Sequence, residues 1–273
     1  MLYLVGLGLR GIRSLTLEGE SVIRRCQEVY FEYYTSIPPK STLESLESYF
    51  SREIKPLART EIETGTTFFQ RARDLDICVI VTGDPLSATT HNQIRYDLLN
   101  TGIQVEVIEN SSILTEAPSR SGLFHYRFGP PVSLPFCTEK FLPSSVLEKI
   151  KRNLANSFHT LLLLDLNGQE PMSPSEAAGF LLKMEERYGT RVINKDTGIV
   201  LLSSLHMPEE KIVRCKMGDL LHIRNEVGPS VILIPSTMNE QEKTFLSAFS
   251  REFNEVFSED NSQQHPSHRR EKH

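Results

Sequence analysis

An unbroken apolar run at Ile77–Val81 ends abruptly in a polar turn, and it constrains the fold more than any other stretch of the chain. Such a run is typical of a strand buried on both faces in a parallel sheet. Gly83 permits a positive φ and Pro85 fixes its own φ at about −65°, so a sharp turn with Asp84 at its tip is expected. Hydroxyls at 87–90 offer N-caps for a following helix. Because ligands in open α/β sheets bind beyond the carboxyl ends of strands, this loop is the first candidate for a ligand site.

Strand and helix patterns alternate through the first part of the chain. This alternation predicts an α/β fold with a mostly parallel sheet and right-handed crossovers. Gly6 and Gly8 follow the first strand and allow the backbone to approach a ligand or another loop closely. A dinucleotide-binding turn is the weaker interpretation of these glycines. Besides the central run, strands are predicted at 2–5, 29–31, 51–56 and 104–108, and helices at 17–26, 41–50, 60–73 and 93–99.

Glycines and prolines gather between 119 and 135 and mark a loop-rich connection. We therefore predict two α/β domains, at 1–118 and 119–257. The tail at 258–273 has no apolar anchor and is predicted to be disordered. In the second domain, strands are predicted at 132–136, 159–165, 199–203, 212–215 and 231–234, and helices at 144–156, 173–188 and 239–257.

The overall balance of the 273 residues, 39% hydrophobic and 24% charged, is that of a folded globular protein. A net charge of −5 gives no reason to expect nucleic acid or an anionic membrane as partner. No apolar run is long enough to span a bilayer, and the segment 1–9 lacks the basic start of a signal peptide, so we expect a cytoplasmic protein.

Cysteine and histidine usage favours neither a metal nor a disulfide framework. The four cysteines, Cys26, Cys78, Cys137 and Cys215, are widely separated and have no histidine at ligand spacing. Reduced thiols packed as small hydrophobes are the favoured interpretation, with a zinc or disulfide role as the alternative. The three histidines of the tail are expected to be solvated.

Six segments, in order, resemble the diphthine synthases, methyltransferases of diphthamide biosynthesis within the tetrapyrrole methylase (class III) superfamily of S-adenosylmethionine enzymes. GDPLSATTH at 83–91 is the most specific match. The other five are MLYLVGLGL at 1–9, EYYTS at 32–36, NSSI at 110–113, GLFHYRFG at 122–129 and HTLLLLDL at 159–166.

The resemblance implies a fold, a methyl donor and a substrate. It implies two α/β domains with S-adenosylmethionine bound in the cleft between them, no metal, and usually a homodimer. The implied substrate is a modified histidine of elongation factor 2 that carries a 3-amino-3-carboxypropyl group. The donor-binding positions of the family, several of which act through backbone atoms, correspond here to Leu9, Asp84, Ser87, Ser112, Ile113, Leu164, Leu205 and Ser230.

The residues themselves agree with part of this chemistry. Methyl transfer from a sulfonium requires alignment of nucleophile, methyl and sulfur, and it needs no covalent intermediate, so the lack of a Ser/His/Asp constellation does not argue against catalysis. Asp84 is a candidate acceptor for a hydroxyl or ammonium of the donor, with capping of the next helix as its alternative role. For His91, a position on the substrate side and a packing role both remain open. No general base is identified from the sequence.

Several positions depart from the family pattern. Arg10-Gly11 stands where relatives commonly carry a small or variable residue and an acid, and Ser230 where many carry histidine. A cation that points toward the sulfonium is unfavourable, whereas a cation at the rim of the site is suited to a carboxylate. Two other functions remain as alternatives: a member of the fold that binds the donor or a partner without catalysis, and a tetrapyrrole methylase.

Overall fold

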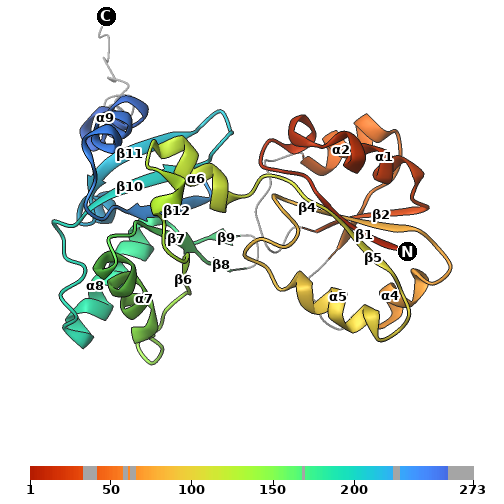
Figure 1. Cartoon of the computed structure of the whole chain (residues 1–273), viewed down its shortest axis with the longest axis horizontal. Helices are drawn as coiled ribbons and strands as arrows, with labels where there is room; N and C mark the ends of the chain where they lie inside the picture. Colours follow the sequence, from red (N-terminus) through yellow and green to blue (C-terminus); the bar gives the residue numbers. More distant parts are fainter. Residues whose placement is uncertain (33–41, 58–60, 62–65, 168–169, 224–227, 258–273) are drawn as a thin grey trace, which may run out of the picture. The chain divides into compact units, whose positions relative to one another are not determined.

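A computed structural model describes residues 1–32, 42–57, 61, 66–167, 170–223 and 228–257. The chain forms two compact units (Figure 1). The first contains Met1–Glu116 together with Leu166–Pro171 and His206–Pro208, and the second contains the remaining described residues. The predicted division at residue 118 is a single cut, whereas two short segments from the later part of the chain pack with the first unit. Residues 33–36 of the matching segment EYYTS and the predicted tail at 258–273 lie outside the described residues.

The first unit is built on a fully parallel five-stranded sheet, as predicted. The central run is strand β4, which lies between β2 and β1 and is buried along its whole length. The strands, in the order β3-β2-β4-β1-β5, are β3 (Lys55–Leu57), β2 (Glu28–Glu32), β4 (Ile77–Val81), β1 (Leu2–Gly6) and β5 (Val105–Ile108).

Helices cover both faces of this sheet (Figure 1). On one face, α1 (Leu17–Arg25) and α2 (Thr42–Phe50) pack against alternate strand residues such as Cys78 and Ile80. On the other, α4 (Thr66–Arg71) and α5 (His91–Leu99) cover the remaining residues of β4. Burial on both faces explains why the strand is apolar at every position.

The hydroxyl-capped start predicted for α5 is wrong in one respect. Thr90 occupies the N-cap position, but its side chain makes no capping hydrogen bond, and its φ of −94° and ψ of 6° lie outside the extended region typical of a cap. The first helix, by contrast, is capped by a hydroxyl, because the Thr16 side chain accepts a hydrogen bond from the Gly19 amide at 3.0 Å.

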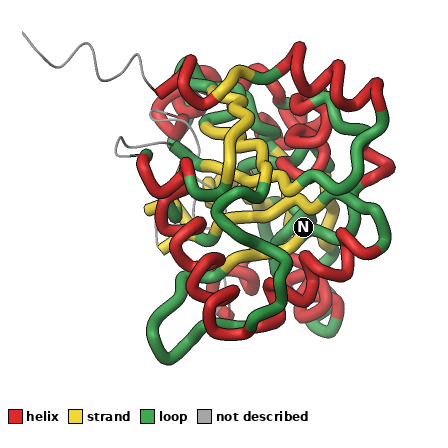
Figure 2. Tube along the Cα trace, turned by 90° about the vertical axis from the view of Figure 1, so that its left-hand side faces the viewer, coloured by secondary structure: helices red, strands yellow, loops and turns green. Residues whose placement is uncertain are grey.

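The second unit contains a six-stranded mixed sheet. Strand β12 is antiparallel to both of its neighbours, while β6 is parallel to β7. Figure 2 shows the strands of the chain in yellow, with red helices beside them. The order is β13 (Arg251–Glu252), β11 (Lys211–Lys216), β10 (Gly198–Ser203), β12 (Ser230–Ile234), β7 (Thr160–Leu164) and β6 (Val132–Leu134).

Two helices, α7 (Ser144–Ala155) and α8 (Pro174–Tyr188), cover one face of this sheet. Ser173 and Glu176 form the capping box of α8, and Pro174 stands at its first position. The other regular elements are α6 (Ile113–Ser121), α9 (Glu240–Phe249), α10 (Phe253–Phe257), the pair β8 (Leu166–Asn167) and β9 (Glu170–Pro171), and the 3-10 turns η1 (Gly11–Ser14), η2 (His125–Arg127) and η3 (Asp219–His222).

The single closing helix predicted at 239–257 is wrong. Helix α9 ends at Phe249, Ser250 adopts an extended conformation with φ −129° and ψ 157°, and β13 then pairs in parallel with β11. The amide and the hydroxyl of Ser250 both donate to the carbonyl of Leu246, which closes the last turn of α9. Pairing with an existing strand therefore overrides the local helical pattern.

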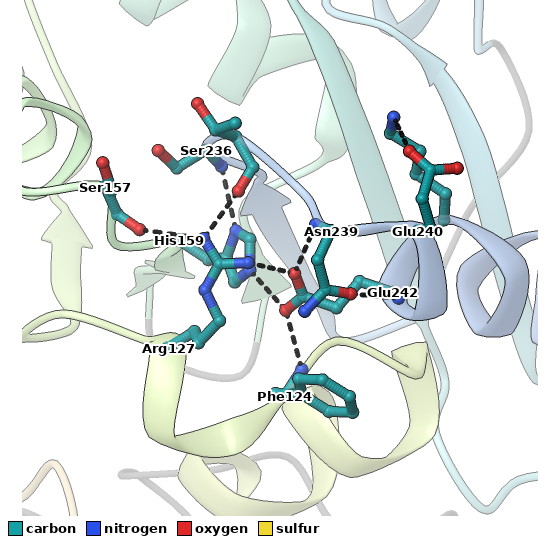
Figure 3. A network of polar contacts seen from close by, with 10 residues as sticks. Phe124, Arg127, Ser157, His159, Ser236, Asn239, Glu240 and Glu242 are labelled. Atoms are coloured by element: carbon teal, nitrogen blue, oxygen red, sulfur yellow. Dashed lines mark hydrogen bonds and ion pairs between the residues drawn. The ribbon is translucent and has the colours of Figure 1, made fainter.

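A buried polar network fastens α9 to the sheet of the second unit (Figure 3). The Ser236 amide donates to His159 Nδ1 at 2.9 Å, so the ring proton lies on Nε2 and is donated to Glu242 Oε1, also at 2.9 Å. The other carboxylate oxygen accepts from the Asn239 amide at 3.1 Å and contacts the guanidinium of Arg127. His159 and Glu242 are both fully buried.

The pKa of each member of the buried pair is lowered. Burial lowers the pKa of His159 more than the neighbouring Glu242 raises it. Burial acts to raise the pKa of Glu242, but hydrogen bonds from His159 and from the amides of Asn239 and Phe124 outweigh burial. The network thus holds a neutral imidazole against an ionised carboxylate.

Candidate functional site

The carboxyl edge of the first sheet brings three loops together. Gly8 and Gly83 pair through two backbone hydrogen bonds of 3.0 Å, which joins the loop after β1 to the loop after β4. Both glycines have positive φ, +68° and +78°, a conformation that other residues rarely adopt. A Cβ on Gly6 would lie 2.7 Å from Asn110 Cβ and 2.8 Å from the Gly83 carbonyl oxygen, so the loop after β5 is equally close. The convergence requires glycine at these positions.

Asp84 lies at the tip of the loop after β4, as predicted, and its carboxylate spans two loops. Oδ1 accepts from the Leu86 amide at 3.0 Å, and Oδ2 accepts from the Asn110 amide at 3.3 Å. Neither contact is to α5, so the alternative role of capping that helix is wrong. Each carboxylate oxygen has further lone pairs and the residue is only half-buried, so it keeps the capacity to accept from a ligand.

The other predicted donor residues of the first unit lie in the same three loops. Leu9 follows the glycine loop, and its Cδ2 is 3.7 Å from the position that a Gly83 Cβ would take. Ser87 lies in the turn beyond Asp84. Ser112 is buried and its hydroxyl accepts from the Leu114 amide at 3.2 Å, at the start of α6, where Ile113 is the first residue. The structure brings these predicted positions to one edge of the sheet.

His91 is completely buried, which favours the packing role over a substrate-facing one. Its Nδ1 lies 2.7 Å from the Pro85 carbonyl oxygen, and its Nε2 lies 3.7 Å from a carboxylate oxygen of Glu32. The ring therefore contacts the backbone of the loop that carries Asp84.

The predicted donor residues of the second unit share one edge of its own sheet. Strands β10 and β12 place Ser203 opposite Ser230, and β12 and β7 place Val231 opposite Leu163. Because β12 is antiparallel to both neighbours, its first residue, Ser230, lies at the same edge as the carboxyl ends of β7 and β10. Leu164 is the last residue of β7, and Leu205 follows β10 by two positions.

Ser203 is a member of this edge that sequence reasoning missed. Its hydroxyl is fully buried and bonds to the hydroxyl of Ser230, which in turn donates to the Gly228 carbonyl at 2.7 Å. Only the antiparallel register reveals the pair, since the two serines are 27 positions apart in the sequence.

Asn110 is a second residue whose role the sequence did not reveal, although it begins one of the matching segments. Its side-chain amide donates to the carbonyls of Gly6 at 2.9 Å and Ser14 at 3.0 Å, and its Oδ1 accepts from the Ser111 amide at 2.8 Å. Asn110 is thus the side chain that ties the glycine loop to the loop after β5.

The glycine loop has the spacing Gly6-x-Gly8-x-x-Gly11 but not the structure of a dinucleotide fingerprint. The third glycine of that fingerprint permits close packing of helix on strand. Here Gly11 starts the 3-10 turn η1 and has no atom within 4 Å of where a Cβ would be, while α1 begins only at Leu17. This geometry argues against the dinucleotide-binding interpretation of the glycines.

Comparison with known proteins shows the family to which the chain belongs. The family model of the tetrapyrrole (corrin/porphyrin) methylases matches residues 1–221. The chain belongs to this family. As a tetrapyrrole-methylase-family protein it has the expected α/β fold and is a methyltransferase with S-adenosylmethionine as the methyl donor.

Individual relatives agree over nearly the whole chain. A diphthine synthase of Thermoplasma acidophilum is 40% identical over 94% of this chain and 98% of its own length. A diphthine methyl ester synthase of Saccharomyces cerevisiae is 33% identical over 92% of this chain and 89% of its own. A crystal structure of diphthine synthase superposes with a TM-score of 0.82 at 28% identity, covering 93% of this chain and 98% of that one.

The edge of the first sheet has features that suit a polar ligand such as the donor. Thr82 follows β4 directly, and its hydroxyl oxygen is buried without a hydrogen-bond partner among the described residues. A buried polar atom of this kind is normally satisfied by a ligand or water.

Among the described residues, no group of three or more potential metal ligands is gathered in one place. No described helix is long and apolar enough to cross a membrane.

Proposed function

We propose that this methyltransferase methylates the 3-amino-3-carboxypropyl group of a modified histidine on elongation factor 2, in the biosynthesis of diphthamide. The observation that carries the proposal is similarity to diphthine synthases along nearly the whole chain, with 40% identity to one of them over 94% of the residues. The GDPLSATTH loop, the most specific matching segment, occupies the edge where the three loops of the first unit meet.

The first unit supplies part of the donor site in this proposal. Asp84 accepts a hydroxyl or ammonium of the donor, and its bonds to the Leu86 and Asn110 amides hold the carboxylate in one orientation. Leu9 and Ile113 supply apolar surface, and the backbone near Ser112 and Ser87 supplies donors and acceptors. The sulfonium supplies an already activated methyl group, so the task of these residues is alignment and exclusion of water.

The second unit contributes Leu164, Leu205 and Ser230 in the same proposal. All three lie along one edge of the mixed sheet, which supports a shared role. The hydroxyl of Ser230 already donates to the Gly228 carbonyl, so a contact to the donor through the backbone of Ser230 is favoured.

The decisive experiment is incubation of the protein with radiolabelled S-adenosylmethionine and elongation factor 2 from cells blocked at this step. Label is expected on elongation factor 2 and is expected to disappear when its modified histidine is replaced. Donor binding without transfer would instead support a non-catalytic member of the fold, and label on a porphyrin or corrin alone would support a tetrapyrrole methylase.

A cytoplasmic homodimer is the assembly that we propose for this enzyme. The resemblance to the diphthine synthases supports the dimer. Light scattering coupled to size-exclusion chromatography is expected to give twice the chain mass of 31.1 kDa, and a monomer mass would reject the dimer without touching the proposed chemistry.

A further inference from the structure

Arg10 is an exposed cation in the loop after β1, at the carboxyl edge of the first sheet. The proposed reaction gives this side chain no role. Arg10 follows Leu9 directly, and its amide donates to the Ser14 hydroxyl at 2.9 Å, which fixes the start of η1. Between Gly6 and Thr16 the loop carries two cations, Arg10 and Arg13, and no acidic residue. The loop therefore presents a local positive charge in a chain that is negative overall.

The Arg10 side chain is held by a histidine and a glutamate of the same unit. Arg10 Nε donates to His206 Nδ1 at 3.1 Å, and His206 Nε2 lies 2.7 Å from Glu116 Oε2. Because Nδ1 accepts, the ring proton lies on Nε2 and is donated to the carboxylate. The His206 side chain is only 5% exposed, and its backbone has a φ of +65°. An unusual backbone conformation thus places a buried ring against an exposed arginine.

This arrangement leaves the outer side of the guanidinium available. Of the three side-chain nitrogens of Arg10, Nε is hydrogen bonded, and neither Nη atom has a hydrogen-bond partner among the described residues. Two parallel N–H groups match the two oxygens of a carboxylate. A side chain fixed at Nε loses less rotamer freedom when it binds such a group.

The proposed reaction contains one chemical group that fits this fork, and it occurs in both reactants. The methionine end of the donor and the 3-amino-3-carboxypropyl group of the acceptor both carry an α-amino carboxylate. A guanidinium is repelled by the sulfonium but attracted by a carboxylate at the rim. We propose that Arg10, held by His206 and Glu116, binds such a carboxylate and makes the enzyme specific for a carboxylate-bearing reactant. This inference rests on the proposed function.

The donor arm of the test compares two ligands by calorimetry. S-adenosylhomocysteine carries the amino-acid end, and 5′-methylthioadenosine lacks it. If the carboxylate is that of the donor, Arg10→Gln weakens S-adenosylhomocysteine about tenfold and leaves methylthioadenosine unchanged. Arg13→Gln, with the same charge change three positions away on an exposed side chain, is the matched control and should alter neither affinity.

The acceptor arm measures steady-state methylation of elongation factor 2. If the carboxylate is that of the acceptor, Arg10→Gln raises the KM for elongation factor 2 about tenfold while both calorimetric affinities stay at the wild-type value. Arg10→Lys keeps the charge but loses Nε and the fork, so only part of the loss should be restored.

The positioning role of the histidine–glutamate pair has its own variant. Glu116→Gln removes the charge that orients His206, and it should produce a smaller loss in the same arm that Arg10→Gln affects. Thermal unfolding of Arg10→Gln, followed by circular dichroism, should match the wild type, because Arg10 is exposed.

Two results overturn the proposal. The first is an Arg10→Gln enzyme with wild-type values in both arms. The second is an equal loss for S-adenosylhomocysteine and methylthioadenosine, which would mean that Arg10 acts only through the loop. If the wild type does not methylate elongation factor 2, the proposed function fails separately. The donor arm alone then decides on Arg10, and only a loss confined to S-adenosylhomocysteine supports it.

Discussion

Asp84 Oδ2 accepts a hydrogen bond of 3.3 Å from the backbone amide of Asn110, so the carboxylate links the loop after β4 to the loop after β5. The side chain of Asn110 in turn holds the carbonyls of Gly6 and Ser14. The loops after β1, β4 and β5 therefore form one hydrogen-bonded assembly, and a change in any of them reaches the others. Asp84 thus orders the assembly, and in the proposed function its carboxylate also binds the donor.

Asp84→Ala is expected to weaken S-adenosylhomocysteine about tenfold and to lower the free energy of unfolding by about 1–2 kcal/mol, because the amides of Leu86 and Asn110 lose their acceptor. Calorimetry and urea unfolding measure the two effects. Glu109→Ala, which removes an exposed carboxylate next to Asn110, is the control and should change neither. An unchanged affinity in the Asp84 variant would remove this side chain from the donor site.

Gly6→Ala tests the close approach of the loops. The new methyl group would lie 2.7 Å from Asn110 Cβ and 2.8 Å from the Gly83 carbonyl oxygen, so one loop must move. We expect the free energy of unfolding to fall by about 3 kcal/mol and donor binding to be lost. Gly179→Ala, inside α8 with no atom within 4 Å, should instead stabilise the protein by about 0.5–1 kcal/mol. Urea unfolding of both variants measures the contrast, and similar values for the two would contradict it.

The first sheet and the predicted donor loops could be predicted from the sequence because their signals are local. The bounds of β4 agree residue for residue, since an apolar run between Asp76 and Thr82 followed by Gly83 and Pro85 leaves no other choice. Hydroxyl and carboxylate side chains after successive parallel strands must meet at one edge. Sequence therefore placed Asp84 and Ser112 at the same site.

The parts that the sequence could not reveal depend on contacts between distant residues. Arg10 and His206 are 196 positions apart, and no local sequence pattern predicts their hydrogen bond. The Ser203–Ser230 pair requires the antiparallel register of β10 and β12. The break at Ser250 arises because β11 offers an edge to Arg251, which a helical pattern cannot reveal.

Acidification is expected to destabilise the second unit through His159 and Glu242. The pKa of each is lower in the folded protein than its ordinary value, 6.5 for histidine and 4.5 for glutamate. The unfolded chain therefore binds more protons as the pH falls, first below about 6.5 and then below about 4.5, and the stability decreases in both steps. Urea unfolding at pH 7.5, 5.5 and 3.5 measures this decrease.

Glu242→Gln removes the charge that this network is built around. We expect the free energy of unfolding at pH 7 to fall by about 3 kcal/mol, because Arg127 then has no ionised partner within a buried cluster. Glu240→Gln, in the same helix, affects only an exposed pair with Lys243 and should cost less than about 0.5 kcal/mol. Equal losses for the two variants would show that the buried network contributes nothing special.

Ser230 offers a test of how the second unit would contact the donor. Its hydroxyl donates to the Gly228 carbonyl and bonds to Ser203, so Ser230→Ala should lower the stability by about 1 kcal/mol. If the donor is bound through the backbone at this position, the affinity for S-adenosylhomocysteine changes little in Ser230→Ala. Ser230→Leu should abolish binding, since a large side chain cannot fit where Ser230 is 9% exposed and packed against its neighbours. An alanine variant that binds as poorly as the leucine variant would mean that the hydroxyl itself is the contact, and that its bond to Gly228 must break when the donor enters.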